Sequence, residues 1–170
     1  MLKKAKEIMR FVGKMLSRAL TSLFKKKDCP VKGSIVYCDL GKSAAFFEHS
    51  GVYVGNGKIV HRDGDGKIEK VSPKEFLNRL DGKNIAKSIY VSYRGVNAAG
   101  SDEVAKRALT AVSDSRHKGY GLLTKNCHQF CQYCLTGEEK GITDCSLASL
   151  KGTLKEVYEC DDWRKWNIDI

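Results

Sequence analysis

Apolar side chains along residues 1–27 recur at alternating spacings of three and four, which is the period of one face of an α-helix. Basic residues lie largely between these positions. The pattern stops at Asp28-Cys29-Pro30, because the residue before a proline disfavours helical backbone. We therefore predict an amino-terminal amphipathic helix whose apolar stripe consists of Leu2, Ala5, Met9, Val12, Leu16, Ala19 and Leu23.

Four short segments rich in β-branched and aromatic residues follow, and each predicts a β-strand. They are residues 34–40, 50–54, 58–61 and 89–93. Four further segments start at or just after a capping residue and continue with helical spacing, which predicts helices. They are residues 72–80, a segment that starts at 101, residues 127–135 and residues 146–158. Antiparallel strands packed against a few helices make the expected fold class α+β.

Spacing and capping patterns add detail to three of these helices. Ser72 and Glu75, with Pro73 between them, predict a capping box at the first. In the helix that starts at 101, the residues expected to face the core are Ala105, Ala108, Leu109 and Val112. In the last helix they are Leu147, Leu150, Leu154 and Val157.

The net charge of +10 is concentrated at the start of the chain. Residues 1–27 hold nine lysines and arginines against Glu7 alone, so the remaining residues are nearly neutral. We expect one domain over 28–170, preceded by the basic helix at 1–27. A nearly neutral domain gives no reason to expect nucleic acid as a partner. A basic, apolar-faced helix favours an anionic membrane surface or an acidic partner, with packing against its own domain as the alternative.

The 7 cysteines are an odd number, and no secretory signal is visible because Arg10, Lys14 and Arg18 interrupt the apolar centre that a signal peptide needs. No apolar run is long enough to span a bilayer. We expect reduced thiols in a cytoplasmic protein, which is peripheral at a membrane surface if the basic helix binds one.

Asn126 can cap the helix that Cys127 begins. A thiol in the first helical turn lies near the positive end of the helix dipole and near unpaired backbone amides, and both favour the thiolate. The same amides can receive the oxyanion that forms when a thiolate attacks a carbonyl. Cys127 is therefore the candidate nucleophile, and the alternative is a buried structural cysteine.

Two histidines flank a predicted hairpin, and its register decides whether they can cooperate. A two-residue turn at Asn56-Gly57 would place His49 and His61 on opposite faces. A three-residue loop over residues 55–57 would pair Val54 with Lys58 and place the histidines on one face, roughly 7–8 Å apart at Cα. This second register also gathers Val52, Val54 and Val60 on one apolar face, so we predict it.

In this register His49 is the expected base for the thiol, and His61 is the residue that orients it. His128 follows Cys127 directly but lies about 100° away around the helix, so we do not expect it to be the base. His117 is expected in a surface loop.

Cys127, Cys131 and Cys134 have a spacing found in cysteines that hold an iron–sulfur cluster. The three positions also form one stripe of a helix, and a fourth zinc ligand is not evident. Cys131 and Cys134 are therefore expected in the core beneath the nucleophile, and no metal or cofactor is expected.

Two segments resemble a known family. Residues 49–61 (HSGVYVGNGKIVH) are similar to the H-box of the lecithin:retinol acyltransferase-like proteins, and residues 120–130 (YGLLTKNCHQF) are similar to their Asn-Cys box. The resemblance implies a circularly permuted papain-like fold of the NlpC-type superfamily. It also implies Cys127 as nucleophile, His49 as base and His61 as third polar residue. The chain departs from the family at His128, where an acidic residue is common.

Members of this family form an acyl-thioester from a phospholipid and pass the acyl group to water, an amine or another lipid. The resemblance therefore implies a cysteine-dependent acyl hydrolase or acyltransferase acting on a phospholipid or another acyl lipid. One alternative is a cysteine peptidase or amidase acting on peptide or cell-wall substrates. Another is a non-enzymatic adaptor that the basic helix brings to membranes.

Overall fold

The computed structural model describes residues 28–38, 48–78, 86, 88–114, 126–138, 144 and 146–168. The predicted helix at 1–27 and His117 lie outside these residues. Within them the chain forms seven strands and four helices. The strands are β1 (Ile35–Cys38), β2 (His49–Gly55), β3 (Lys58–Arg62), β4 (Ile68–Val71), β5 (Tyr90–Arg94), β6 (Asn97–Ala98) and β7 (Asp162–Lys165). The helices are α2 (Pro73–Leu77), α3 (Asp102–Ser113), α4 (Cys127–Thr136) and α5 (Leu147–Tyr158).

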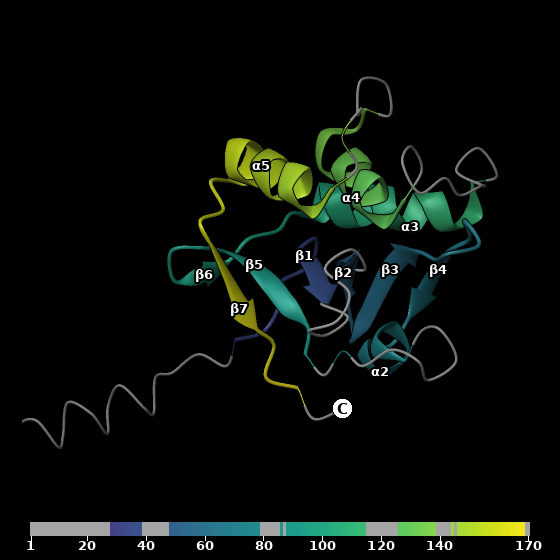
Figure 1. The fold of residues 1–170 in the computed structure, drawn as a ribbon, viewed down its shortest axis with the longest axis horizontal. Coiled ribbons are helices and arrows are strands. Elements are labelled where there is room, and N and C mark those ends of the chain that lie inside the picture. The colour runs from purple at the N-terminus through teal and green to yellow at the C-terminus, as the bar shows by residue number, and fades with distance from the viewer. Residues whose placement is uncertain are drawn as a thin grey trace, which may run out of the picture.

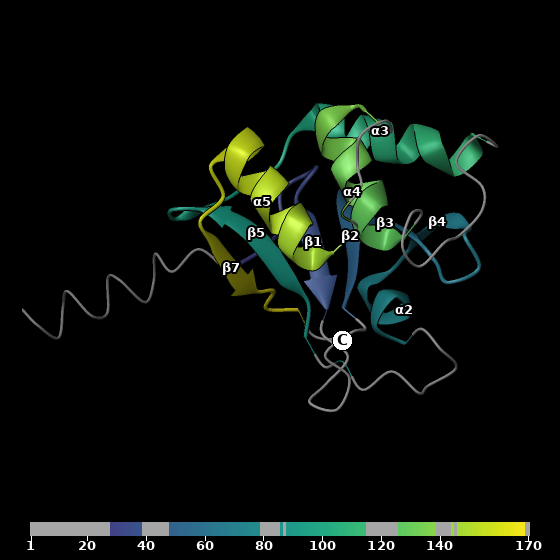
Figure 2. The ribbon, with the colours of Figure 1, turned by 45° about the horizontal axis from the view of Figure 1, so that its top comes forward.

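The strands form one antiparallel sheet in the order β4-β3-β2-β1-β5-β6, and β7 also pairs with β5. Helices α3, α4 and α5 lie together over one face of the sheet, and the short α2 lies on the other side near β3 and β4 (Figure 1). Figure 2 shows α4 above β2 and β3, between α5 and α3. The α+β prediction is confirmed.

Each face of the sheet has its own apolar cluster, because successive side chains of a strand point to opposite faces. The cluster under the three helices includes Ile35, Val52, Val60, Phe130 and Leu150. The cluster on the α2 side includes Val36, Ile59, Phe76, Val91 and Trp166. A slip of one residue in any strand would exchange the two sets, so the strand register is strongly specified.

The β2–β3 hairpin has the predicted register in its body but a different turn. Val52 pairs with Val60 and Tyr53 with Ile59, as expected, whereas the next pair is Gly55 with Lys58. The predicted three-residue loop is therefore wrong. Asn56 and Gly57 form a two-residue turn with positive φ at both positions (51° and 64°), as a type I′ turn requires. An irregularity between Tyr53 and Gly55 supplies the extra residue, so a β-bulge produces the register that the loop was expected to produce.

The predicted inward faces of α3 and α5 are partly wrong. In α3 the buried residues are Val104, Ala105, Ala108 and Ala111. Leu109 and Val112 are exposed because the small alanines turn toward the sheet instead. In α5, Leu147, Leu150 and Leu154 are buried as expected, but Val157 is exposed. The next inward-facing residue comes four positions after Leu154 instead of three, so Tyr158 packs on the core and Val157 does not.

Three of the strands were not predicted: β4, β6 and β7. They are two to four residues long; charged residues interrupt the apolar pattern of β4 and β7, and β6 consists only of Asn97 and Ala98. The capping box of α2 is present, with Ser72 and Glu75 bonding reciprocally. The helix ends at Leu77, with Asn78 as its C-cap, and not at residue 80. It places Phe76 against the sheet.

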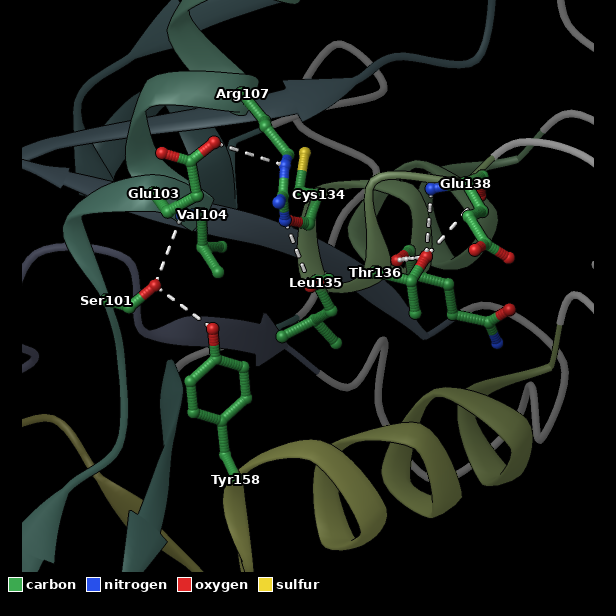
Figure 3. A network of polar contacts seen from close by, with 10 residues as sticks. Ser101, Glu103, Val104, Arg107, Cys134, Leu135, Thr136, Glu138 and Tyr158 are labelled. Atoms are coloured by element: carbon green, nitrogen blue, oxygen red, sulfur yellow. Dashed lines mark hydrogen bonds and ion pairs between the residues drawn. The ribbon is translucent and has the colours of Figure 1, made fainter.

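Polar contacts join the three covering helices at one end (Figure 3). Arg107 of α3 donates from Nη1 to the backbone oxygens of Cys134 (3.0 Å) and Leu135 (3.1 Å) in the last turns of α4. A cation is favourable there because it faces the negative end of the helix dipole. The hydroxyls of Ser101, at the start of α3, and Tyr158, at the end of α5, lie 3.0 Å apart. The Arg107 contacts thus tie the last turns of α4 to α3, and the Ser101–Tyr158 contact ties α3 to α5.

Two glycines let the chain entering α3 pass directly against the start of β1. A Cβ on Gly100 would lie 2.5 Å from the backbone nitrogen of Ser34, and a Cβ on Gly33 would lie 1.9 Å from the backbone oxygen of Ser101. Backbone atoms cannot move aside as a side chain can. The packing of α3 on the sheet therefore requires glycine at these positions.

We predict that Gly100→Ala lowers the free energy of unfolding by about 1–3 kcal/mol, because the added methyl group meets the backbone of β1. Gly152→Ala is the matched control. Gly152 lies in α5, and a Cβ there would have no neighbour within 4 Å. Its replacement should raise the free energy of unfolding by about 1 kcal/mol through helix propensity. Urea unfolding of the three proteins measures both effects, and equal changes would contradict the close approach.

Candidate active site

Helix α4 places the predicted nucleophile at its first position. The side chain of Asn126 accepts a hydrogen bond from the backbone N–H of Gln129 (3.0 Å), so the predicted N-cap is present. Cys127 is buried, and its Sγ lies 4.0 Å from the backbone oxygen of Glu48, within range for a sulfur donor. Glu48 directly precedes His49. The thiol therefore lies beside the end of β2 that carries the first histidine.

The two predicted histidines are brought together. His49 Nε2 lies 2.9 Å from His61 Nδ1, and the rings meet edge to face with centroids 4.9 Å apart. Both side chains are buried. Phe76 of α2 packs against both rings, with centroids 5.0 Å from His49 and 5.5 Å from His61. The prediction that they share one face of the hairpin is confirmed, and the pair is shielded from water.

Gly51 leaves the space in which this pair packs. A Cβ there would lie 2.7 Å from Ile59 Cγ2, 2.9 Å from the backbone oxygen of Val60 and 3.1 Å from a ring carbon of Phe76. Any side chain at this position would push β3 or the phenyl ring away. Close contact between the two imidazoles and their aromatic cover therefore depends on glycine in β2.

His128 contacts β2 on the opposite face of the sheet from the histidine pair. Its Nδ1 lies 2.9 Å from Ser50 Oγ, and both residues are buried. Ser50 also hydrogen-bonds the thiol of Cys131. The contact joins the first turn of α4 to β2, which positions Cys127. Sequence reasoning missed Ser50, although its place directly after His49 in a strand predicts that it faces the other way.

A second contact joins the start of α4 to β3. Arg62 is buried, donates from Nη1 to Gln129 Oε1 (3.2 Å) and lies 5.9 Å from the ring centre of Phe130. Gln129 thus contributes twice at the start of α4: its backbone N–H donates to Asn126, and its side chain accepts from Arg62. Arg62 was missed as well. Arg62 directly follows His61 in β3, so the two side chains point to opposite faces of the sheet. His61 contacts His49 on one face, and Arg62 contacts α4 on the other.

The other cysteines of α4 are core residues, as predicted. Cys131 and Cys134 are fully buried. Burial raises the pKa of both thiols well above the ordinary range, so both stay protonated at neutral pH. Burial also raises the pKa of Cys160, to about 11. Among the described residues, no group of three or more His, Cys, Asp or Glu side chains is arranged to hold a metal ion.

Comparison with known proteins gives a family match. The model of the family described as lecithin retinol acyltransferase matches residues 30–140. No curated protein and no solved structure matches significantly. The matched residues run from β1 through α4, so they include the histidine pair, Asn126 and Cys127. They make up well over half of the chain. The chain therefore belongs to the lecithin retinol acyltransferase family, whose papain-like fold is represented here by the antiparallel sheet and its helices.

Proposed function

We propose that the chain is a cysteine-dependent acyl hydrolase or acyltransferase that forms an acyl-thioester at Cys127, with a phospholipid or another acyl lipid as donor. Membership of the family indicates acyltransferase- or hydrolase-type activity, without specifying the substrate or the nucleophile. The observation that carries the finer proposal is the buried His49–His61 contact of 2.9 Å at the end of β2, beside the capped helix start where Cys127 lies.

In the first half of the proposed reaction, His49 takes the thiol proton and Sγ attacks the carbonyl carbon of the ester. The oxyanion that forms is stabilised by backbone amides in the first turn of α4 and by the positive end of its dipole. The carbon–oxygen bond then breaks, and the imidazolium of His49 returns its proton to the leaving alkoxide. The acyl group remains on Cys127 as a thioester.

In the second half, water, an alcohol or an amine attacks the thioester while His49 accepts the proton of the attacking group. The tetrahedral intermediate then expels the thiolate and releases the acyl product. His61 holds the ring of His49 throughout. Phe76 keeps water from the two imidazoles and so strengthens the hydrogen bond between them.

Two other functions use the same geometry differently. A cysteine peptidase or amidase would attack a peptide carbonyl with the same groups, and a comparison of lipid ester with peptide substrates distinguishes it. A non-enzymatic adaptor would keep the fold without a reactive thiol. An electrophilic activity-based thiol probe that labels Cys127 in the native protein, but not after denaturant treatment, argues for the enzyme.

The basic segment 1–27 is proposed to bring this activity to an anionic membrane surface in the cytoplasm. It carries +8 of the net charge of +10 beside an apolar stripe. Each basic residue near an anionic surface contributes roughly 1 kcal/mol, and salt screens the attraction. None of the helices in the described part of the chain is long and apolar enough to cross a bilayer.

Cys127→Ser should lower kcat/KM for a lipid ester by about 10³-fold or more while leaving the unfolding temperature nearly unchanged. The hydroxyl is close in size to the thiol but is far less acidic. Cys134→Ala is the matched control in the same helix stripe. It should keep activity but lower the free energy of unfolding by about 1–3 kcal/mol, because it leaves a cavity in the core. Wild-type activity in Cys127→Ser would exclude the thioester.

His49→Ala should reduce kcat by about 10²–10⁴-fold, the range for loss of a general base. His61→Ala should reduce it less, and His61→Gln should retain more activity than His61→Ala because an amide can still hydrogen-bond the imidazole. Steady-state assays with a short-chain ester measure kcat for the three variants and so rank their losses. If His61→Ala costs more than His49→Ala, the assigned roles are reversed.

A protein that starts at Asp28 should stay folded, cleave a soluble short-chain ester and fail to bind anionic vesicles. The full chain should bind such vesicles at low salt and leave them at high salt. Co-sedimentation and thermal melts of both proteins test this. A helix packed on its own domain predicts the reverse: the full chain ignores vesicles and the shortened protein melts at a much lower temperature.

A further inference from the structure

Glu69 lies directly opposite His61 in the β3–β4 pairing, so both side chains occupy the same face of the sheet. One carboxylate oxygen, Oε1, lies 3.8 Å from His61 Nε2. The other, Oε2, lies 2.7 Å from the Nζ of Lys67, an exposed side chain on the solvent side. His61 is almost fully buried and Glu69 is partly exposed. A negative charge therefore lies next to the histidine nitrogen that points away from His49.

We propose that Glu69 is a positioning residue that fixes the tautomer of His61 and, through it, the tautomer of His49. This inference rests on the proposed roles of the two histidines, and it adds a fourth residue to Cys127, His49 and His61. Glu69 lies in a strand that neither sequence motif includes, and it approaches His61 only because β4 pairs with β3 in this register.

A neutral imidazole carries one proton, on either Nδ1 or Nε2. The carboxylate of Glu69 favours the tautomer with the proton on Nε2 of His61, because the N–H dipole then points toward the negative charge. In that tautomer Nδ1 of His61 has only a lone pair. The 2.9 Å contact then requires that His49 donates from Nε2.

The consequence falls on the other nitrogen of His49. When Nε2 carries the proton, Nδ1 carries the lone pair and can accept a proton from a thiol. In the opposite arrangement, His61 would donate from Nδ1, His49 would accept at Nε2, and the proton on Nδ1 of His49 would prevent it from acting as the base. Glu69 therefore selects the arrangement in which His49 is a base with Nδ1 available.

The contact between Glu69 and His61 is longer than a direct hydrogen bond, so the carboxylate acts chiefly through its field. Burial of His61 limits the screening of this field by solvent. The competing explanation is a surface ion pair in which Glu69 and Lys67 serve only each other. A surface ion pair predicts equal effects when either Glu69 or Lys67 is replaced, whereas the proposal predicts a larger loss of kcat when Glu69 is replaced.

The test compares Glu69→Leu with Lys67→Leu in the full chain. Each change removes the ion pair, but only the first removes the charge beside His61. Glu69→Leu should lower kcat about 10- to 100-fold with little change in KM, a range seen for other groups that orient functional histidines. Glu69→Gln should recover part of the loss because its amide oxygen can accept from Nε2–H. Lys67→Leu should keep wild-type kcat.

A second readout does not depend on activity. The chain has only 4 histidines, so imidazole ¹⁵N NMR of histidine-labelled protein can assign the tautomer of each. The wild type and Lys67→Leu should show His61 and His49 both protonated on Nε2. Glu69→Leu should shift His61 toward the Nδ1-protonated form. This readout still tests the inference if Glu69→Leu lowers stability, because Glu69→Gln should show a weaker shift in the same direction.

Protonation of His61 on Nδ1 in the wild type would overturn the inference. So would equal losses of activity in Lys67→Leu and Glu69→Leu, or an unchanged tautomer in Glu69→Leu. The proposed function fails separately: a wild type without acyl-transfer activity that has the Nε2 tautomer at both histidines would refute the function and support the tautomer assignment.

Discussion

The hydrogen bond between His49 and His61 depends on one extra residue in β2. The two-residue turn at the hairpin tip would by itself place the imidazoles on opposite faces of the sheet. The bulge between Tyr53 and Gly55 shifts the pairing by one residue, and the remainder of the hairpin then aligns Val52 with Val60. The same shift sends the valines to the helix side and both histidines to the other. Core packing and the candidate site therefore require the same register.

The site is assembled from both faces of the sheet. The histidine pair lies on the α2 side, where Phe76 covers it. The helix that begins with Cys127 lies on the opposite side, held by the contacts of His128 with Ser50 and of Gln129 with Arg62. Each of these strand residues directly follows a histidine of the pair. Because successive side chains of β2 and β3 point to opposite faces, one residue of each adjacent pair belongs to the histidine pair and the other holds α4. The histidine pair and Cys127 approach each other at the end of β2.

Much of this arrangement is visible in the sequence because it is local. The capping residues Ser72 and Asn126 have short-range signatures, and the alternation in β2 and β3 is strong. The turn was mispredicted because Gly-Asn-Gly suits both a two-residue and a three-residue connection, and only the valine core selects the register. The inward face of α3 was mispredicted because apolar residues cover a wide arc of that helix, and close packing by alanine decides between them.

The contacts that hold α4 could not be predicted from spacing. Ser50 and His128 are 78 residues apart in the sequence, and Arg62 and Gln129 are 67 apart. A polar residue in a strand gives no sign of a partner at such a distance. Glu69 was overlooked for a related reason, because β4 is short and carries two charged residues, so its pairing with β3 left no hydrophobic pattern.

The proposed reaction requires that Cys127 carries the acyl group between donor and acceptor. The most direct measurement is mass spectrometry of the intact protein, quenched in acid shortly after mixing with phospholipid vesicles. A thioester at Cys127 predicts a mass increase equal to one acyl group replacing one hydrogen. The increase should be lost on treatment with hydroxylamine and located by digestion to the peptide that contains Cys127. An acyl group found on another residue, with Cys127 unmodified, would contradict it.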